Sequence, residues 1–128
     1  MGRILLIDDD PAFTDFLSAY IRDTYPLLQV EICNNPIIAL QNIKTGTYDL
    51  MLIDLEMPTM DGLKLLGFAI QSGINKNRIV ILSGREADVL HKLCPMGTCL
   101  AVLNKFEARQ KAVLDMIFSS LHKKAGGS

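Results

Sequence analysis

Residues 50–62 read LMLIDLEMPTMDG, an apolar run that ends in an aspartate and leads through a proline and a glycine into a second apolar pattern. We predict a buried strand over residues 48–53, because a short run with almost no polar residue is typical of a strand covered on both faces. The spacing of apolar residues after the loop predicts a helix over residues 63–72, stopped by Gly73. Strand, loop and helix in this order form one unit of a parallel sheet covered by helices.

The same unit recurs along the whole chain. Two of the helix starts carry an N-cap residue followed by proline, at Asp10-Pro11 and Asn35-Pro36. The expected strands are 3–7, 28–33, 48–53, 78–82 and 100–103, and the expected helices are 11–24, 36–45, 63–72, 86–93 and 107–122. Five strands alternating with five helices and joined by right-handed crossovers predict a flavodoxin-like, doubly wound α/β fold with the parallel strand order 2-1-3-4-5.

Length and composition narrow the class of protein. A chain of 128 residues suits one domain, which we assign to residues 1–122, and residues 123–128 are expected to form a flexible tail or the start of a linker. The 13 basic and 14 acidic residues give a net charge of −1, so we expect no direct binding of nucleic acid or of a membrane surface. The apolar runs fall far short of the roughly 18 residues of a membrane span. Since no signal peptide is visible either, we expect a cytoplasmic protein.

The three cysteines are expected to be free thiols, because an odd and sparse number does not indicate a disulfide framework. A metal site made of Cys94, Cys99 and His91 is disfavoured, since their spacing matches no standard zinc pattern. We therefore expect small, mostly buried side chains at the cysteine positions.

Polar residues follow the strands at their carboxyl ends, where ligands bind in folds of this kind. These residues are Asp8-Asp9-Asp10, Asp54, Ser83 and Asn104-Lys105. Clustered carboxylates repel one another unless a cation neutralises them, and hard oxygen ligands favour Mg²⁺ or Mn²⁺ over zinc. A carboxylate beside such an ion can attack phosphorus, while a lysine and a hydroxyl bind the phosphoryl oxygens. The strand ends therefore indicate phosphoryl transfer.

Single members of this set have simpler interpretations. Asp10 is expected to cap a helix rather than to bind a metal, and Asp61-Gly62 is expected to form a turn. A lone lysine after a strand is usually solvated, and a lone serine there often caps the next helix. The functional interpretation therefore depends on all of these residues falling at strand ends in the right order.

The chain resembles the receiver domains of two-component response regulators over about residues 3–121. The matching stretches are residues 4–11 (ILLIDDDP), 54–62 (DLEMPTMDG) and 81–84 (ILSG), together with Lys105. The resemblance implies that Asp54 is the phosphoacceptor and that the donor is a sensor histidine kinase or a histidine phosphotransfer protein. It also implies a switch that acts on an output or partner, rather than an enzyme.

The resemblance further implies a role for each neighbour of Asp54. Asp9 would bind Mg²⁺ directly and Asp8 mainly through water, with Asp54 and the backbone carbonyl of Glu56 as further ligands. Ser83 would be the hydroxyl switch residue, and Lys105 would be the lysine of the family pattern. A homodimer or target surface is expected on helix 86–93, strand 100–103 and helix 107–122, where the candidate contacts, if exposed, are Val89, Leu93 and Cys94.

Two positions depart from the family pattern. Phe106 follows Lys105 where the family usually has proline, often in a cis peptide. Because a cis bond before a non-proline residue costs about 2.5–4 kcal/mol, we expect this bond to be trans or strained. Val102 stands where a switching tyrosine or phenylalanine is common, so we expect output signalling through backbone shifts around residues 78–103.

Glu56 and Arg85 lie two residues after Asp54 and Ser83 respectively. We expect both side chains to face the entrance of the phosphorylation site. There they would pair, hinder the hydrolytic water and lengthen the lifetime of the aspartyl phosphate. The alternative is two solvated charges, worth about 0–1 kcal/mol as a pair.

Two other functions stay open. The departures at Val102 and Phe106 are compatible with an unphosphorylated pseudo-receiver that acts as an interaction module. A phosphatase of the haloacid dehalogenase type would also use an aspartate, Mg²⁺ and a lysine. It would need a second aspartate two residues after the nucleophile, where this chain has Glu56.

Overall fold

The computed structural model describes residues 2–58, 60–85, 87–95 and 97–127. Its sheet has five parallel strands in the order β2-β1-β3-β4-β5, as predicted for a flavodoxin-like fold. The strands are β1 (Gly2–Ile7), β2 (Leu28–Cys33), β3 (Leu50–Asp54), β4 (Ile79–Ser83) and β5 (Ala101–Asn104). Strand β1 pairs with both β2 and β3, so the direction of the chain across the sheet reverses there. Ligands bind at the carboxyl ends of the strands beside such a reversal.

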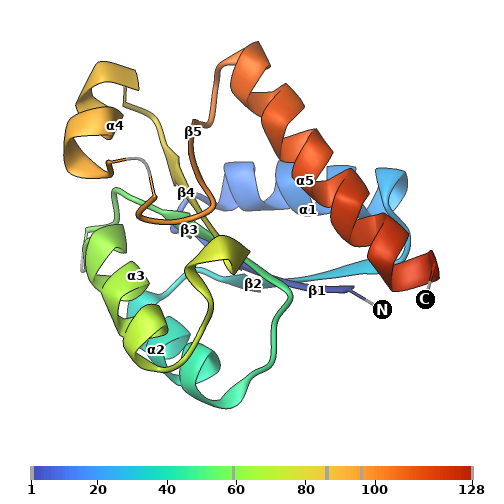
Figure 1. The fold of residues 1–128 in the computed structure, drawn as a ribbon, viewed down its shortest axis with the longest axis horizontal. Coiled ribbons are helices and arrows are strands. Elements are labelled where there is room, and N and C mark those ends of the chain that lie inside the picture. The colour runs from blue at the N-terminus through green and yellow to red at the C-terminus, as the bar shows by residue number, and fades with distance from the viewer. Residues whose placement is uncertain (1, 59, 86, 96, 128) are drawn as a thin grey trace.

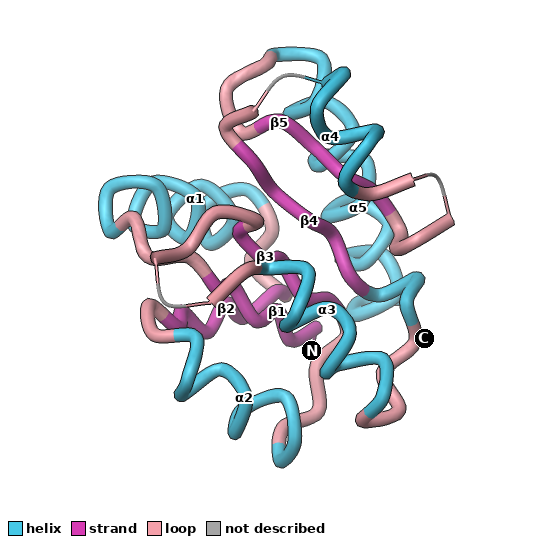
Figure 2. The backbone as a smooth tube through the Cα atoms, turned by 90° about the vertical axis from the view of Figure 1, so that its left-hand side faces the viewer, coloured by secondary structure: helices cyan, strands magenta, loops and turns pink. Residues whose placement is uncertain are grey.

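Helices cover both faces of the sheet (Figure 1). They are α1 (Pro11–Thr24), α2 (Pro36–Thr45), α3 (Gly62–Gln71), α4 (Ala87–Leu93) and α5 (Ala108–Gly127). Buried residues of α2, α3 and α4 pack on one face, and those of α1 and α5 pack on the other. Figure 2 shows β1 and β2 between α1 and α2. This is the layered arrangement that the apolar strands required.

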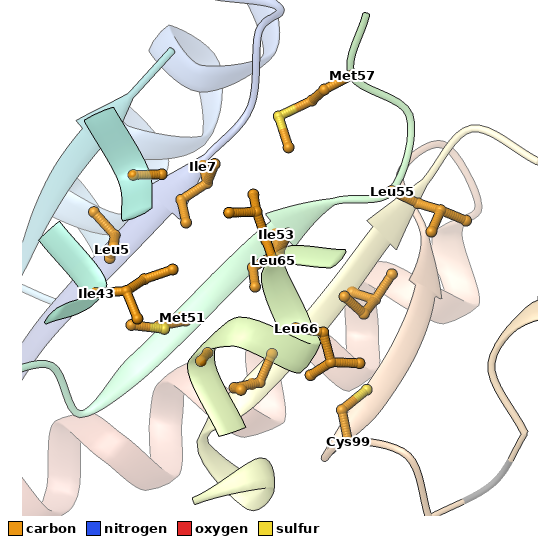
Figure 3. Packing of buried hydrophobic residues seen from close by; sticks show 14 of the residues in the cluster. Leu5, Ile7, Ile43, Met51, Ile53, Leu55, Met57, Leu65, Leu66 and Cys99 are labelled. Atoms are coloured by element: carbon orange, nitrogen blue, oxygen red, sulfur yellow. The ribbon is translucent and has the colours of Figure 1, made fainter. Parts of the chain in front are cut away.

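Alternation along the strands builds the two apolar layers. In β1, Leu5 and Ile7 face the layer of α2, α3 and α4, whereas Ile4 and Leu6 face α1 and α5. Figure 3 shows the first layer, with β3 and α3 contributing Ile53, Leu65 and Leu66. In the second layer, Phe118 of α5 is 0% exposed. Burial on both faces therefore fixes the strands that carry the polar residues at their ends.

Short polar side chains cap the helices as the sequence predicted. Oδ1 of Asp10 accepts the N–H groups of Ala12 and Phe13 at 3.0 and 3.4 Å. Asn35 caps α2 and Asp61 caps α3 in the same way. The interpretation of Asp10 as a helix cap is therefore confirmed, whereas Asp61-Gly62, which was expected to form a turn, begins α3 instead.

Element ends differ from the predictions in two ways. Strands β3, β4 and β5 each end one residue later than expected, so Asp54, Ser83 and Asn104 are themselves the last strand residues. Helix α5 continues to Gly127, so residues 123–127 are helical where a flexible tail or the start of a linker was expected. The physical reason is burial: Ala125 packs against the layer of α1 and α5, which a polar tail composition does not reveal.

Three smaller expectations can be compared with the structure. Cys33, Cys94 and Cys99 are buried free thiols, as predicted. Cys94 is 2% exposed and is therefore excluded as a surface contact, whereas Val89 and Leu93 are both 40% exposed. No cis peptide bond occurs among the described residues, so Lys105-Phe106 is trans. None of the helices described is long and apolar enough to cross a membrane.

Candidate functional site

The carboxyl edge of the sheet gathers the predicted site residues. Asp8 follows β1, Asp54 and Ser83 end β3 and β4, and Lys105 follows β5. Because side chains alternate along a strand, Asp54 points toward the layer of α1 and α5, whereas Ser83 points toward α3 and α4. The fold thus brings the four residues to one edge but puts Asp54 and Ser83 on opposite sides of the sheet.

An acidic cluster lies at this edge. One carboxylate oxygen from each of Asp8, Asp9 and Asp54 lies within 4.8 Å of the other two. Asp8 is 0% exposed and Asp54 is 3% exposed, while Asp9 is partly exposed. Carboxylates this close repel one another unless protons or a cation neutralise them. Three hard oxygen donors of this kind fit a divalent ion of the Mg²⁺ or Mn²⁺ class.

Asp8 is held by two hydrogen bonds and one ion pair. Oδ1 accepts the N–H of Asp10 at 2.9 Å, and the backbone carbonyl accepts Nδ2 of Asn34 at 2.9 Å. Oδ2 lies 2.6 Å from Nζ of Lys105 in a buried ion pair. Asp8 also fits a metal ligand, because its carboxylate lies beside those of Asp9 and Asp54.

Lys105 brings a positive charge to the acidic cluster. Its Nζ lies 3.4 Å from Oδ1 of Asp54 and 4.6 Å from the ring centroid of Phe13, and its side chain is 8% exposed. Burial opposes the charge, but the carboxylates of Asp8 and Asp54 outweigh this effect and raise the pKa of Lys105. The amine is therefore protonated when it faces Asp54. Sequence reasoning missed Phe13, because an aromatic residue in the first turn of a helix is usually part of the core.

Asp54 is a more basic carboxylate than an ordinary aspartate. Burial, and next the charge of Asp8, raise the pKa of Asp54 from 3.8 to about 7. The charge of Lys105 and the N–H of Glu56, which donates to Oδ1 at 3.2 Å, act in the opposite direction. A divalent cation at the acidic cluster would favour the ionised, nucleophilic form.

The hydroxyl of Ser83 is bonded to Glu56. Ser83 Oγ donates to the Glu56 carboxylate, both of whose oxygens are 2.8 Å away. Oε1 of Glu56 also accepts the N–H of Gly84 at 3.1 Å. Ser83 Oγ in turn accepts the N–H of Arg85 at 3.0 Å. The expected switch residue is therefore at the site, but a neighbouring carboxylate engages its hydroxyl.

Glu56 and Arg85 do not form the predicted ion pair. The carboxylate of Glu56 is bonded to Ser83 and Gly84, and none of the ion pairs among the described residues includes Arg85. The pairing is wrong for this structure because a hydroxyl and a backbone N–H lie closer to the carboxylate. Both side chains nevertheless line a cleft of about 710 Å³ beside Asp9, so both face the opening of the site.

Asn104 shapes the loop that carries Lys105. Its Oδ1 accepts the N–H of Phe106 at 2.7 Å, and its Nδ2 donates to the carbonyl of Arg85 at 2.8 Å. The N–H of Lys105 donates to the carbonyl of Ser83 at 2.8 Å. These bonds direct Lys105 toward the acidic cluster without a proline or a cis peptide. The sequence placed Asn104 at a strand end without a role, although asparagine is a frequent turn former.

The family model described as the response regulator receiver domain matches residues 4–118. The chain therefore belongs to the receiver domain family of two-component systems, whose members include phosphoacceptor domains. It is 26% identical over 112 residues to a probable C4-dicarboxylate response regulator of Priestia megaterium, covering 86% of this chain and 49% of that protein. A segment of 61 residues, 48% of this chain, is 33% identical to 6% of the signal transduction histidine-protein kinase BarA of Escherichia coli. The chain thus spans half or less of the length of these relatives.

Solved structures share the fold. The response regulator TrrA of Thermotoga maritima, in complex with Mg²⁺-BeF, is 22% identical with a TM-score of 0.76, covering 94% of this chain and 99% of that one. A CheY-like receiver domain of Methanospirillum hungatei is 25% identical with a TM-score of 0.73, covering 98% and 99%. The receiver domain of a sensor histidine kinase of Pseudomonas aeruginosa, with magnesium in its active-site cleft, has a TM-score of 0.76 at 22% identity, covering 95% and 98%.

Proposed function

We propose that this receiver domain is a phosphoacceptor in a two-component phosphorelay and that Asp54 takes the phosphoryl group. One observation carries the proposal: a buried carboxylate at the end of β3 lies in one cluster with Asp8 and Asp9 and 3.4 Å from a buried lysine. A family member that had lost this chemistry would have no physical reason to bury two carboxylates, Asp8 and Asp54, beside a third at Asp9.

The donor class follows from the family and from the nucleophile. A sensor histidine kinase or a histidine phosphotransfer protein would present a phosphohistidine to the open edge of the sheet. An oxygen of Asp54 attacks phosphorus, the phosphorus–nitrogen bond breaks, and the electron pair returns to the imidazole, which takes up a proton. Oδ1 of Asp54 is held by the N–H of Glu56 and by Lys105, so we assign the attack to Oδ2.

The acidic cluster supports a divalent cation, Mg²⁺ or alternatively Mn²⁺. Asp8, Asp9 and Asp54 would hold it, with the backbone carbonyl of Glu56 as a further ligand. When bound, the ion neutralises charge on the phosphoryl oxygens. Lys105 would bind one phosphoryl oxygen and keep Asp54 ionised, and Ser83 would donate to another. Positioning and charge stabilisation then account for the transfer, and we propose no turnover of a small substrate by the domain itself.

Partners and location complete the proposal. Val89 and Leu93, both 40% exposed, present apolar side chains on α4 for a homodimer or target at the surface of α4, β5 and α5. The net charge of −1 supports a domain that does not bind nucleic acid itself. Three buried free thiols support a reducing compartment such as the cytoplasm.

Beryllofluoride, which mimics an aspartyl phosphate, tests the proposal. We expect Mg²⁺ and beryllofluoride together to shift the amide resonances around Asp54, Ser83 and Lys105 in the nuclear magnetic resonance (NMR) spectrum. The Asp54→Asn protein should show no such change, because it lacks the carboxylate. Unchanged spectra of the parent protein would favour the pseudo-receiver, which the departures at Val102 and Phe106 also allow.

A further inference from the structure

Glu56 engages the donors that a phosphoryl group on Asp54 would use. The Ser83 hydroxyl, which we assign to a phosphoryl oxygen, lies 2.8 Å from both oxygens of the Glu56 carboxylate. The N–H of Gly84, the next donor along the chain, is bonded to the same carboxylate at 3.1 Å. An anionic group of the protein therefore engages a hydroxyl that an anionic phosphoryl group would later need.

We propose that Glu56 is a positioning residue that holds the Ser83 hydroxyl on the side of α3 and α4, away from Asp54, until a phosphoryl group displaces its carboxylate. This inference rests on the proposed phosphoacceptor function of Asp54. It differs from the ion pair with Arg85, because the partner of Glu56 is the switch hydroxyl itself. Phosphorylation is then a competition between two anions for the same donors.

The backbone of Glu56 makes this competition unavoidable. Its N–H donates to Oδ1 of Asp54 at 3.2 Å, so the Glu56 side chain starts next to the phosphorylated residue. A phosphoryl group on Asp54 adds negative charge close to the Glu56 carboxylate, which raises the energy of the bonded arrangement. A hydrogen bond to a charged acceptor is stronger than one between neutral groups, so the bond from Ser83 to Glu56 lowers the affinity for the phosphoryl group to a measurable degree.

A cleft with two positively charged residues can receive the displaced Glu56 carboxylate. Glu56 is partly exposed and lines the cleft of about 710 Å³ beside the site. The cleft is also lined by Lys64 of α3 and by Arg85, whose positive charges would receive the Glu56 carboxylate. The phosphorylated state is thus the one in which Glu56 meets Arg85.

Ser83 links this change to the start of α4. Its Oγ accepts the N–H of Arg85 at 3.0 Å, and the carbonyl of Arg85 accepts Nδ2 of Asn104 at the end of β5. If the hydroxyl turns toward Asp54, the N–H of Arg85 loses its acceptor. The backbone at Gly84 and Arg85 can then rearrange, and this change needs no aromatic side chain at position 102. The bond from Ser83 to Glu56 therefore controls whether a change at Asp54 reaches the surface of α4 and β5.

The test is a titration of beryllofluoride with Mg²⁺, followed by the NMR spectrum of each variant. Glu56→Ala frees both donors and should bind beryllofluoride about tenfold more tightly than the parent. Glu56→Gln keeps the shape without the charge and should bind with intermediate affinity. Asp23→Asn removes an exposed negative charge from the far end of α1 and should bind like the parent. The amide proton of Gly84 should move to lower frequency in free Glu56→Ala.

A double variant separates this mechanism from plain charge repulsion. In a Ser83→Ala background the gain from Glu56→Ala should fall to less than about threefold, because the hydroxyl for which the anions compete is gone. An equal gain with and without Ser83 overturns the inference, as does a Glu56→Ala protein that binds no more tightly than Asp23→Asn. If Glu56→Ala does not fold, the same comparison is made with Glu56→Gln. A parent protein that binds no beryllofluoride refutes the phosphoacceptor function instead.

Discussion

Replacing Asp54 with asparagine should change how the stability of the protein depends on pH. Burial and the charge of Asp8 raise the pKa of Asp54 from 3.8 to about 7 in the folded protein. Between these two values the folded protein binds a proton that the unfolded chain has released, so the free energy of unfolding falls as the pH rises. Asparagine cannot ionise, so this decrease is absent from the Asp54→Asn protein.

The expected magnitude follows from the two pKa values. Between pH 5 and pH 8 the stability of the parent should fall by about 2–3 kcal/mol relative to Asp54→Asn. Groups far from Asp54 titrate in both proteins and cancel in the difference. Saturating Mg²⁺ at pH 8 should reduce the difference in stability. The cation binds to the folded parent more tightly than to Asp54→Asn, because the variant offers it one carboxylate fewer.

Urea unfolding, followed by circular dichroism in buffer with a chelator at pH 5, 6.5 and 8, measures this difference. Asp23→Asn, at an exposed position on α1, is the matched control and should keep the pH dependence of the parent. A difference between Asp54→Asn and the parent that stays constant from pH 5 to pH 8 would refute the reasoning, because Asp54 would then have no raised pKa.

Four substitutions test the packing in the core and around the site by urea unfolding. Gly62→Ala should destabilise the fold by more than about 2 kcal/mol, because its Cβ would overlap the backbone carbonyl of Asp54, whereas Gly67→Ala, in open space on α3, should stabilise by about 0.5–1 kcal/mol. Equal effects of the two changes would contradict the close approach at Gly62. Phe118→Ala should cost about 3–5 kcal/mol because the ring is 0% exposed, and a cost below 1 kcal/mol would exclude it from the core. Lys105→Ala should cost about 3–5 kcal/mol by leaving Asp8 buried without a positive charge, and Mg²⁺ should restore part of that loss. A loss of stability that Mg²⁺ does not change would contradict the idea that Lys105 and Mg²⁺ both neutralise the buried carboxylates.

Local signals and topology made much of this structure predictable from sequence. Asp10-Pro11 and Asn35-Pro36 mark helix starts by chemistry that acts within one turn. The convergence of Asp8 and Asp54 needed one more step, because only the parallel strand order brings β1 and β3 together. Their proximity follows once the topology is known.

The remaining features depend on packing at a distance, which no local pattern encodes. Glu56 was expected to meet Arg85, but the loop geometry brought its carboxylate to Ser83 and Gly84 instead. Helix α5 continues past His122 because Ala125 packs against the apolar layer of α1 and α5. Such choices between neighbouring partners are decided by about 1 kcal/mol, which residue types alone do not resolve.

The most direct measurement of the central claim is intact mass spectrometry after incubation with acetyl phosphate and Mg²⁺. The parent protein should gain the mass of one phosphoryl group, and fragmentation should place it on Asp54. The Asp54→Asn protein should gain nothing, and Asp23→Asn should behave like the parent. A phosphoryl group that still appears on Asp54→Asn, or that maps to another residue of the parent, would contradict the assignment of Asp54 as the acceptor.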